Sequence, residues 1–105
     1  MTDRSAEVFA ALADPTRRRV IDHLSRKGPA SATELAGTLP VSRQAVAKHL
    51  ALLEDAGLVA GERAGRERRF RLTPGPLADA VSWMASVGSE WDERLDALRR
   101  NLRRR

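Results

Sequence analysis

The sequence contains no cysteine and only two histidines, His23 and His49. Without cysteine it can form no disulfide, iron–sulfur cluster or thiolate metal site. Neither histidine has a nearby serine, cysteine or carboxylate in an arrangement typical of a catalytic triad, and the glycines match no phosphate-binding loop. We therefore expect a protein that is not an enzyme and that holds no metal or cofactor. The alternative is a metal site built from oxygen ligands such as Asp79, Glu90, Asp92 or Glu93, but it lacks the histidines that such sites usually use, and we interpret these residues as a solvated helix face.

Long apolar runs are also missing. No segment approaches the roughly 20 consecutive apolar residues that a membrane-spanning helix needs. The start of the sequence shows no apolar stretch followed by a cleavage-like site. We therefore expect a cytoplasmic protein with no membrane partner.

Positive charge is what the sequence has in excess. The 105 residues carry a formal net charge of +5, and the pI is near 11.2. This length suits one domain with a modest core, and the basic balance favours a nucleic-acid partner. Lys27 and Lys48 are the only lysines, so the excess is almost all arginine and part of it reflects general composition. The positions of the charges are therefore more informative than their sum.

A short helix followed by a tight turn is predicted between Ser31 and Val41. Ser31 and Glu34 have the spacing of a capping box, in which the serine oxygen accepts from the third helical amide and the carboxylate accepts from the serine amide. The helix is expected to begin at Ala32. It is expected to be short, because Pro40 disfavours helical dihedrals at the residue before it. The turn is expected at residues 39–41.

A second N-cap, Ser42, opens the next predicted helix. Its apolar residues Val46, Leu50 and Leu53 recur at steps of four and three, which predicts one buried stripe. Gly57 suits the left-handed residue that closes a helix. Two helices joined by a tight turn have the layout of a helix-turn-helix, whose second helix enters the major groove of DNA.

The face opposite the stripe carries polar side chains near its N-terminal end. Arg43 suits bidentate pairing with guanine and Gln44 with adenine, while Lys48 suits a phosphate. The amide ends of both helices can also bind phosphate. The DNA-binding residues expected from the two helices are Ser31, Thr33, Ser42, Arg43, Gln44, Ala47 and Lys48. The alternative for this face alone is an ordinary solvated surface.

Two short strands are expected next, at 58–63 and 68–72, around a turn at 64–67 that contains a glycine. A basic hairpin directly after a recognition helix is a wing. We expect Arg66, Arg68 and Arg69 to reach phosphates or the neighbouring minor groove. The alternative is a pair of strands that alternate charged and apolar residues without contacting DNA.

The helix before this region is opened by Asp14 as N-cap and Pro15 as first residue. Its basic run, Arg17, Arg18 and Arg19, lies near that start. The run either contacts phosphate or solvates one helix face, and we favour the second interpretation.

Three segments resemble the ArsR family of bacterial winged-helix repressors: ALADPTRRRVIDHL (11–24), VSRQAVAKHLALLEDAGLV (41–59) and GRERRFRL (65–72). They are similar to the opening helices, the recognition helix and the wing of that family, and the resemblance covers essentially the whole chain. It implies a mostly α-helical winged helix-turn-helix with a small β-hairpin. It also implies a dimeric repressor whose interface is formed by the first and last helices, with one recognition helix per protomer.

The sequence departs from the family pattern in two places. Many relatives carry serine where this chain has Ala47, whose methyl group could touch thymine instead. The metal-sensing branch carries paired cysteines in the helix before the turn, where this chain has Thr33, Glu34 and Ala36. We therefore identify the chain as a cysteine-free member that is not of the metal-sensing type.

The C-terminal third predicts one long helix from Pro76 with an apolar seam. Apolar residues recur at alternating steps of four and three up to Leu102, a heptad pattern typical of two helices packed along a shared axis. So long a helix cannot bury its seam on so small a domain, so a second protomer is expected to cover it. The expected interface residues are Val8, Phe9, Leu12, Leu77, Val81, Met84, Gly88, Trp91, Leu95 and Leu98.

Two alternatives concern this helix. Gly88 is either a point of close helix approach or a break at which Ser89 caps a new helix, and we favour a single helix. Trp83 and Trp91 are either interface residues or a platform for a ligand, and we favour the interface. We accordingly divide the single domain, 1–105, into a winged-helix core at 4–74, a dimerisation helix at 76–102 and a basic tail at 103–105.

Two functions fit these patterns. The first is a sequence-specific repressor that binds double-stranded DNA as a homodimer, at an inverted repeat in a promoter. The second is a winged helix that binds an acidic protein partner without reading bases. Arg43 and Gln44 beside a basic wing favour the first, because a protein-binding module has no need of both. The sequence does not identify an effector molecule.

Overall fold

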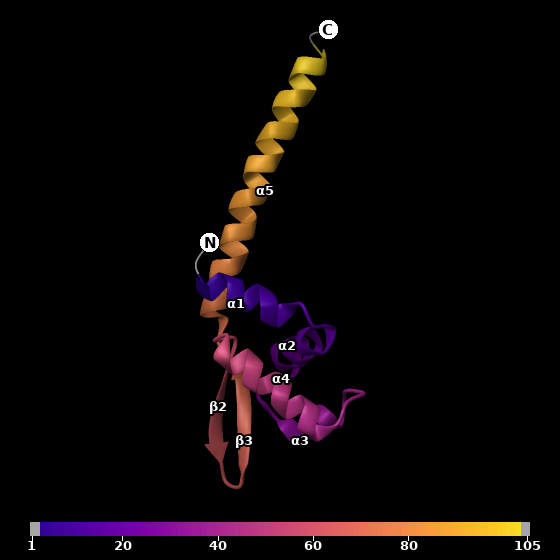
Figure 1. Cartoon of the computed structure of the whole chain (residues 1–105), viewed down its shortest axis with the longest axis vertical. Coiled ribbons are helices and arrows are strands. Elements are labelled where there is room, and N and C mark those ends of the chain that lie inside the picture. Colours follow the sequence, from indigo (N-terminus) through magenta and orange to yellow (C-terminus); the bar gives the residue numbers. More distant parts are fainter. Residues whose placement is uncertain (1–2, 104–105) are drawn as a thin grey trace.

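The computed structural model describes residues 3–103, as five helices and a three-stranded sheet (Figure 1). The elements in chain order are α1 (Asp3–Leu12), α2 (Pro15–Lys27), β1 (Ala30–Ser31), α3 (Ala32–Ala36), α4 (Arg43–Asp55), β2 (Val59–Ala64), β3 (Glu67–Leu72) and α5 (Pro74–Arg103). The sheet is antiparallel with strand order β1-β3-β2. The expected winged helix-turn-helix, mostly α-helical with a small hairpin, is confirmed, and the short strand β1 is an addition that the sequence did not reveal.

The core draws side chains from every helix and strand. Val46, Leu50 and Leu53 are fully buried, so the predicted stripe of α4 is confirmed. Val8 of α1 is also fully buried within its own chain. Its prediction as a residue of a dimer interface is therefore wrong, because the face of α1 that carries Val8 and Ala11 packs inward rather than toward a partner.

Helix α2 begins as the sequence predicted, with Asp14 as N-cap and Pro15 in the first turn. The Asp14 carboxylate accepts from the amides of Thr16 and Arg17, and these bonds hold its pKa below the ordinary value even though burial acts to raise it. The side chain of Arg17 donates to the carbonyls of Ala10 and Ala11. A helix leaves its last carbonyls without partners, so Arg17 closes the end of α1.

Arg18 has a similar role, since its Nη1 donates to the Leu12 carbonyl at 2.7 Å. Neither interpretation of the basic run therefore holds for Arg17 or Arg18. Both side chains reach back across the α1–α2 turn instead of contacting phosphate or only solvating a helix face.

The caps of the helix-turn-helix are largely as predicted. Ser31 Oγ accepts from the Glu34 amide at 3.2 Å, and Ser42 Oγ accepts from the Ala45 amide at 3.1 Å. Gly57 closes α4 with φ of +78°, and the Leu58 amide donates to the Leu53 carbonyl at 2.9 Å, as in a Schellman motif. The second half of the expected capping box is wrong, because the Glu34 carboxylate turns away and pairs with an arginine of β3.

The hairpin turn is tighter than predicted. Ala64 pairs with Glu67, which leaves Gly65 and Arg66 as a two-residue loop. Gly65, the first residue of the loop, has a φ of +65°, whereas Arg66, the second, does not have a positive φ. A positive φ at the first loop residue alone is typical of a type II′ turn. Figure 1 shows this loop at the far end of the molecule from the C-terminus.

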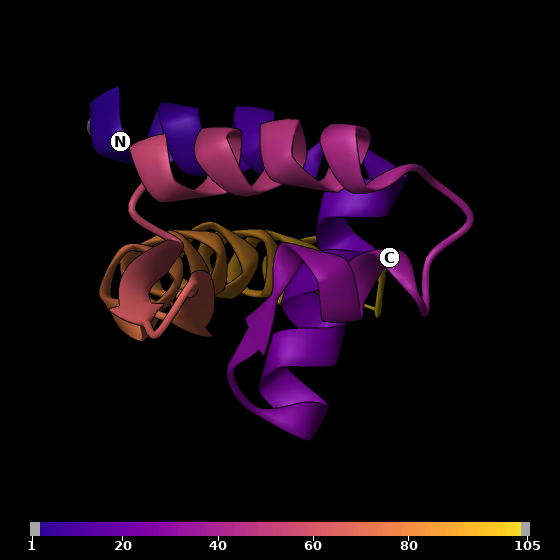
Figure 2. The same cartoon turned by 90° about the horizontal axis from the view of Figure 1, so that it is seen from below.

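Helix α5 is continuous through Gly88, which confirms the single helix that the seam favoured, although it begins at Pro74 rather than Pro76. Its first turns pack beside α1, and the rest projects away from the other elements, so that the molecule measures 69 × 26 × 20 Å (Figures 1 and 2). Among the described residues, no helix has both the length and the apolar composition that a membrane crossing requires.

Candidate nucleic-acid interface

The N-terminal half of α4 presents an exposed polar face. Arg43, Gln44, Ala47 and Lys48 are all exposed, and the buried stripe of the same helix lies on its other side. The side chains of Arg43, Gln44 and Lys48 make no hydrogen bond or ion pair with any other part of the chain that the structure describes. Their donors and acceptors are therefore available to base edges and phosphates.

The N-termini of α3 and α4 differ in their exposure. Thr33 and Ser42 are exposed, as contact with phosphate requires. Ser31 is only 2% exposed, and its hydroxyl is occupied as the cap of α3. Its expected contact with DNA is therefore wrong, because β1 pairs with β3 and covers this residue.

Arg68 lies on the side of the hairpin that faces α4, where it pairs with Glu54. Its Nη1 donates to Glu54 Oε1 at 3.3 Å and its Nη2 to Oε2 at 3.1 Å. The guanidinium carbon lies 5.3 Å from the centre of the Phe70 ring, within the range of a cation–π contact. The structure thus engages Arg68 within the chain, where the sequence expectation placed it on DNA.

Gly61 makes room for this cluster. A Cβ at this position would lie 2.8 Å from Arg68 Cζ and 2.9 Å from Phe70 Cε1. The Gly61 amide donates to Glu54 Oε2 at 3.1 Å. This hydrogen bond, together with the Arg68 guanidinium, holds the pKa of Glu54 below its ordinary value although burial acts in the opposite direction.

Arg69 is engaged on the other side of the hairpin. Its Nη1 donates to Glu34 Oε1 at 2.7 Å and its Nη2 to the Pro29 carbonyl at 2.8 Å. Glu34 belongs to α3, so this contact joins the hairpin to the first helix of the helix-turn-helix. Arg68 and Arg69, neighbours on β3, therefore hold the hairpin to α4 and α3 respectively.

Arg66 and Arg63 are the cations that remain available on the hairpin. Arg66 lies in the turn, Arg63 lies directly opposite Arg68 in the sheet register, and both are exposed. Neither forms an ion pair within residues 3–103. Arg63 was not among the residues expected to bind DNA. The strand register could have indicated it, because Arg63 and Arg68 lie opposite each other and Arg68 is the one that pairs with Glu54.

The seam of α5 lies exposed along the projecting helix. Trp91 is 57% exposed, Leu98 55% and Val81 51%, and Met84 and Leu95 are also exposed. Near the body of the molecule, Phe9 meets Trp83 edge to face, with ring centres 5.7 Å apart. The other expected interface residues of this region, Leu12 and Leu77, are partly buried against the core.

Comparison with known proteins agrees with this geometry. A family model described as a helix-turn-helix domain matches residues 12–62. The chain is 40% identical over 87 residues to the uncharacterised HTH-type transcriptional regulator YuzN of Bacillus subtilis, covering 77% of this chain and 95% of that protein. It is 32% identical over 102 residues to the arsenical resistance operon repressor of Escherichia coli, covering 93% of this chain and 84% of that protein.

Solved structures give the same result. An ArsR-like transcriptional regulator from Rhodococcus sp. RHA1 superposes with a TM-score of 0.76 at 44% identity, covering 90% of this chain and 89% of that one. A homodimeric winged helix-turn-helix DNA-binding domain from Mycobacterium bovis superposes with a TM-score of 0.65 at 28% identity, covering 89% and 82%. With the fold, the exposed recognition helix and these similarities in agreement, the chain belongs to the ArsR family of winged helix-turn-helix transcriptional regulators.

Proposed function

We propose that this protein is a homodimeric repressor that binds an inverted repeat in a promoter and blocks transcription by occupying it. Helix α4 enters the major groove, where Arg43 pairs with guanine and Gln44 with adenine. Lys48 contacts a phosphate, and Ala47 offers a methyl group to thymine. The observation that supports this assignment best is that the side chains of Arg43 and Gln44 are exposed and without intramolecular partners in the described chain, while Arg68 and Arg69 of the hairpin are engaged.

In this proposal the hairpin contacts the DNA backbone through Arg66 at its tip and Arg63 beside it. Arg68 and Arg69 act indirectly, by holding the hairpin to α4 and α3. Thr33 and Ser42 lie at helix N-termini, where backbone amides favour phosphate. The assignment separates residues that read sequence from residues that contribute affinity alone.

A second copy of the chain covers the seam in this proposal. A free helix with exposed Val81, Trp91 and Leu98 leaves apolar surface in water, and burying such surface favours association. The homodimeric state of the similar domain from Mycobacterium bovis supports the same arrangement. Phe9, Leu12 and Leu77 would extend the interface toward the body, and Gly88 would allow close approach of two helices.

Selection of bound duplexes from a random pool tests the proposal. A dimeric reader of bases should enrich an inverted repeat whose half-sites are spaced by about one helical turn or a multiple of it. A monomeric reader would enrich a single half-site, and a protein-binding winged helix would enrich no sequence. Either of these last two results would contradict the proposal.

A further inference from the structure

Arg17 of α2 joins two other helices, because each nitrogen of its guanidinium contacts a different group. Its Nε donates to the Ala11 carbonyl at 2.5 Å and its Nη2 to the Ala10 carbonyl at 3.5 Å, both in the last turn of α1. Its Nη1 lies 3.3 Å from Nδ1 of His49, a half-buried residue of α4. One side chain therefore links the end of α1 to the recognition helix.

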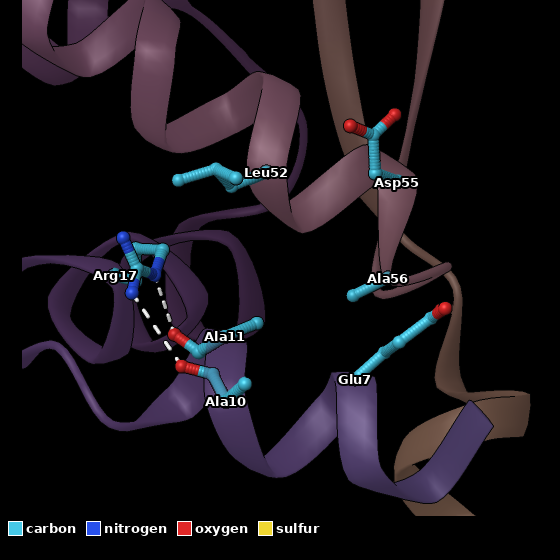
Figure 3. A pocket seen from close by; sticks show the side chains of 7 residues that line it. All are labelled: Glu7, Ala10, Ala11, Arg17, Leu52, Asp55 and Ala56. Carbon is cyan, nitrogen blue, oxygen red and sulfur yellow. Dashed lines mark hydrogen bonds between the residues drawn. The ribbon is translucent and has the colours of Figure 1, made fainter. Parts of the chain in front are cut away.

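Side-chain packing between α1 and α4 is incomplete beside this link. A cleft of about 300 Å³ separates α1 from the C-terminal half of α4, and Figure 3 shows the Arg17 guanidinium at one end of it. The small side chains of Ala10 and Ala11 line one wall, and Leu52, which is 51% exposed, lines the other. Because interiors are normally close-packed, an open cleft means that apolar contacts here do not fix the position of α4 relative to α1. The contact through Arg17 supplies that constraint.

The contact between Arg17 and His49 requires a neutral imidazole. A guanidinium has only donors, so Nδ1 of His49 has to accept. In a neutral imidazole one ring nitrogen accepts and the other carries the proton, whereas both nitrogens of an imidazolium are donors. His49 therefore carries its proton on Nε2 when the contact is made. A proton on Nδ1 would set two donors and two positive charges against each other and break the link.

Two charged groups face the imidazole, and both belong to the start of α2. Besides Arg17, the Asp14 carboxylate lies near enough for the charges of Arg17 and His49 to act on it. Asp14 makes no hydrogen bond to the ring in the described chain, and its Oδ1 accepts two backbone amides instead. Its attraction for an imidazolium therefore opposes only part of the repulsion by the contacting guanidinium. Other charged side chains on the elements packed against α4 are directed elsewhere, namely Arg4, Glu7, Arg18, Glu34 and Glu62.

We propose that Arg17 is a positioning residue for DNA reading, which holds the recognition helix to α1 through neutral His49. Resting on the proposed function, in which α1 borders the dimer seam and α4 reads bases, this link sets how the two recognition helices of a dimer meet the operator. Protonation of His49 releases the link. Base reading then suffers because it depends on the position of α4, while contacts to phosphate are less demanding. Acidification should therefore weaken operator binding more than binding to random DNA.

A pH titration of the imidazoles of the full chain by NMR, without DNA, tests the contact itself. Arg17→Met keeps the length of the side chain and removes the cation, so His49 should take up its proton at a higher pH than in the unmodified chain. Asp14→Asn keeps a good N-cap and removes the anion, so His49 should take up its proton at a lower pH. His23, the only other histidine, is the internal control and should titrate alike in all three proteins.

Operator and random duplexes, each measured at about pH 8 and about pH 5.5, on either side of the usual range of histidine, test the effect on reading. The ratio of operator to random affinity should fall about three- to tenfold on acidification of the unmodified chain. His49→Asn places an amide oxygen where Nδ1 accepts and does not titrate, so it should keep the high ratio at both pH values. His49→Leu has no acceptor and should show the low ratio at both. His23→Gln is the matched control and should keep the full pH dependence.

Three results would overturn the proposal: an unchanged titration of His49 in Arg17→Met, a pH dependence that persists in His49→Asn, or equal ratios for His49→Asn and His49→Leu at about pH 8. A residue that only stabilises the fold would give the last of these, because both variants would then act through stability alone. The imidazole titration contains no DNA, so it decides whether the link exists even if no operator is found and the proposed function fails.

Discussion

Glu54 of the recognition helix and Arg68 of the hairpin form a bidentate ion pair. Arg68 Nη2 lies 3.1 Å from Glu54 Oε2, and Arg68 Nη1 lies 3.3 Å from Glu54 Oε1. The same carboxylate accepts the Gly61 amide at 3.1 Å. Both strands of the hairpin are thereby joined to the helix that carries Arg43 and Gln44. The position of the hairpin on DNA is consequently tied to the position of the reading helix.

The Glu54–Arg68 pair should contribute measurably to stability. Arg68→Ala should lower the free energy of unfolding by about 0.5–1 kcal/mol, a small value because the pair is partly exposed and screened by solvent. Urea denaturation would measure this decrease. Arg26→Ala removes the more exposed pair with Asp22 and should cost less. An equal cost for the two variants would mean that the hairpin is not held by this contact.

The same pair should make stability depend on pH. Because the pKa of Glu54 is lower in the folded chain than its ordinary value of 4.5, its contribution is fully present above pH 4.5. It is lost as the pH falls below 4.5 and through the lower, folded value. The free energy of unfolding should therefore fall less steeply with acidification in Glu54→Gln than in the unmodified chain. Identical slopes for the two proteins would contradict the lowered pKa.

The arginines of the hairpin should separate into two kinds when the salt dependence of DNA binding is measured. Removing one phosphate interaction lowers the slope of log affinity against log salt by about 0.9, and one substitution in a symmetric dimer removes two. Arg66→Ala should therefore flatten the slope by roughly 1–2 units. Arg69→Ala should leave the slope nearly unchanged, because Arg69 is paired with Glu34. A larger change of slope for Arg69→Ala than for Arg66→Ala would show that the roles are reversed.

The seam of α5 should hold the dimer together. Leu95→Glu places a carboxylate in the middle of the seam, where a buried and unpaired charge is strongly penalised, so the dimer should dissociate. Ser86→Glu, at an exposed position on the side of the helix away from the seam, is the control and should remain dimeric. Sedimentation velocity would distinguish the two states. A monomeric unmodified chain at micromolar concentration would contradict the seam as an interface.

Local signals predicted most of the fold. Caps such as Asp14 and Ser42, the closing glycine Gly57 and the stripe of α4 depend on residues within a few positions of each other, so their spacing alone predicts helix bounds. The long helix was predicted from a heptad pattern that extends without a break through Gly88.

Interactions between residues distant in sequence were not predicted. Glu34 was expected to complete its own capping box, yet Arg69, 35 positions later, attracts its carboxylate. Strand β1 has two residues and forms only because β3 lies beside it. The same reason separates the arginines of the hairpin, since Arg68 in β3 lies within reach of the Glu54 carboxylate of α4, whereas Arg66 in the turn pairs with no carboxylate of the described residues.

Base reading by Arg43 is central to the proposed function, and the binding of Arg43→Ala to single-base variants of the selected operator tests it most directly. Arg43→Ala should lose about 1–3 kcal/mol of discrimination at one position in each half-site and keep its preference elsewhere. Gln44→Ala should lose discrimination at a different position, while Lys48→Ala should weaken all duplexes about equally. If Arg43→Ala and Gln44→Ala both keep the base preferences of the unmodified chain, helix α4 does not read DNA and the proposed function is contradicted.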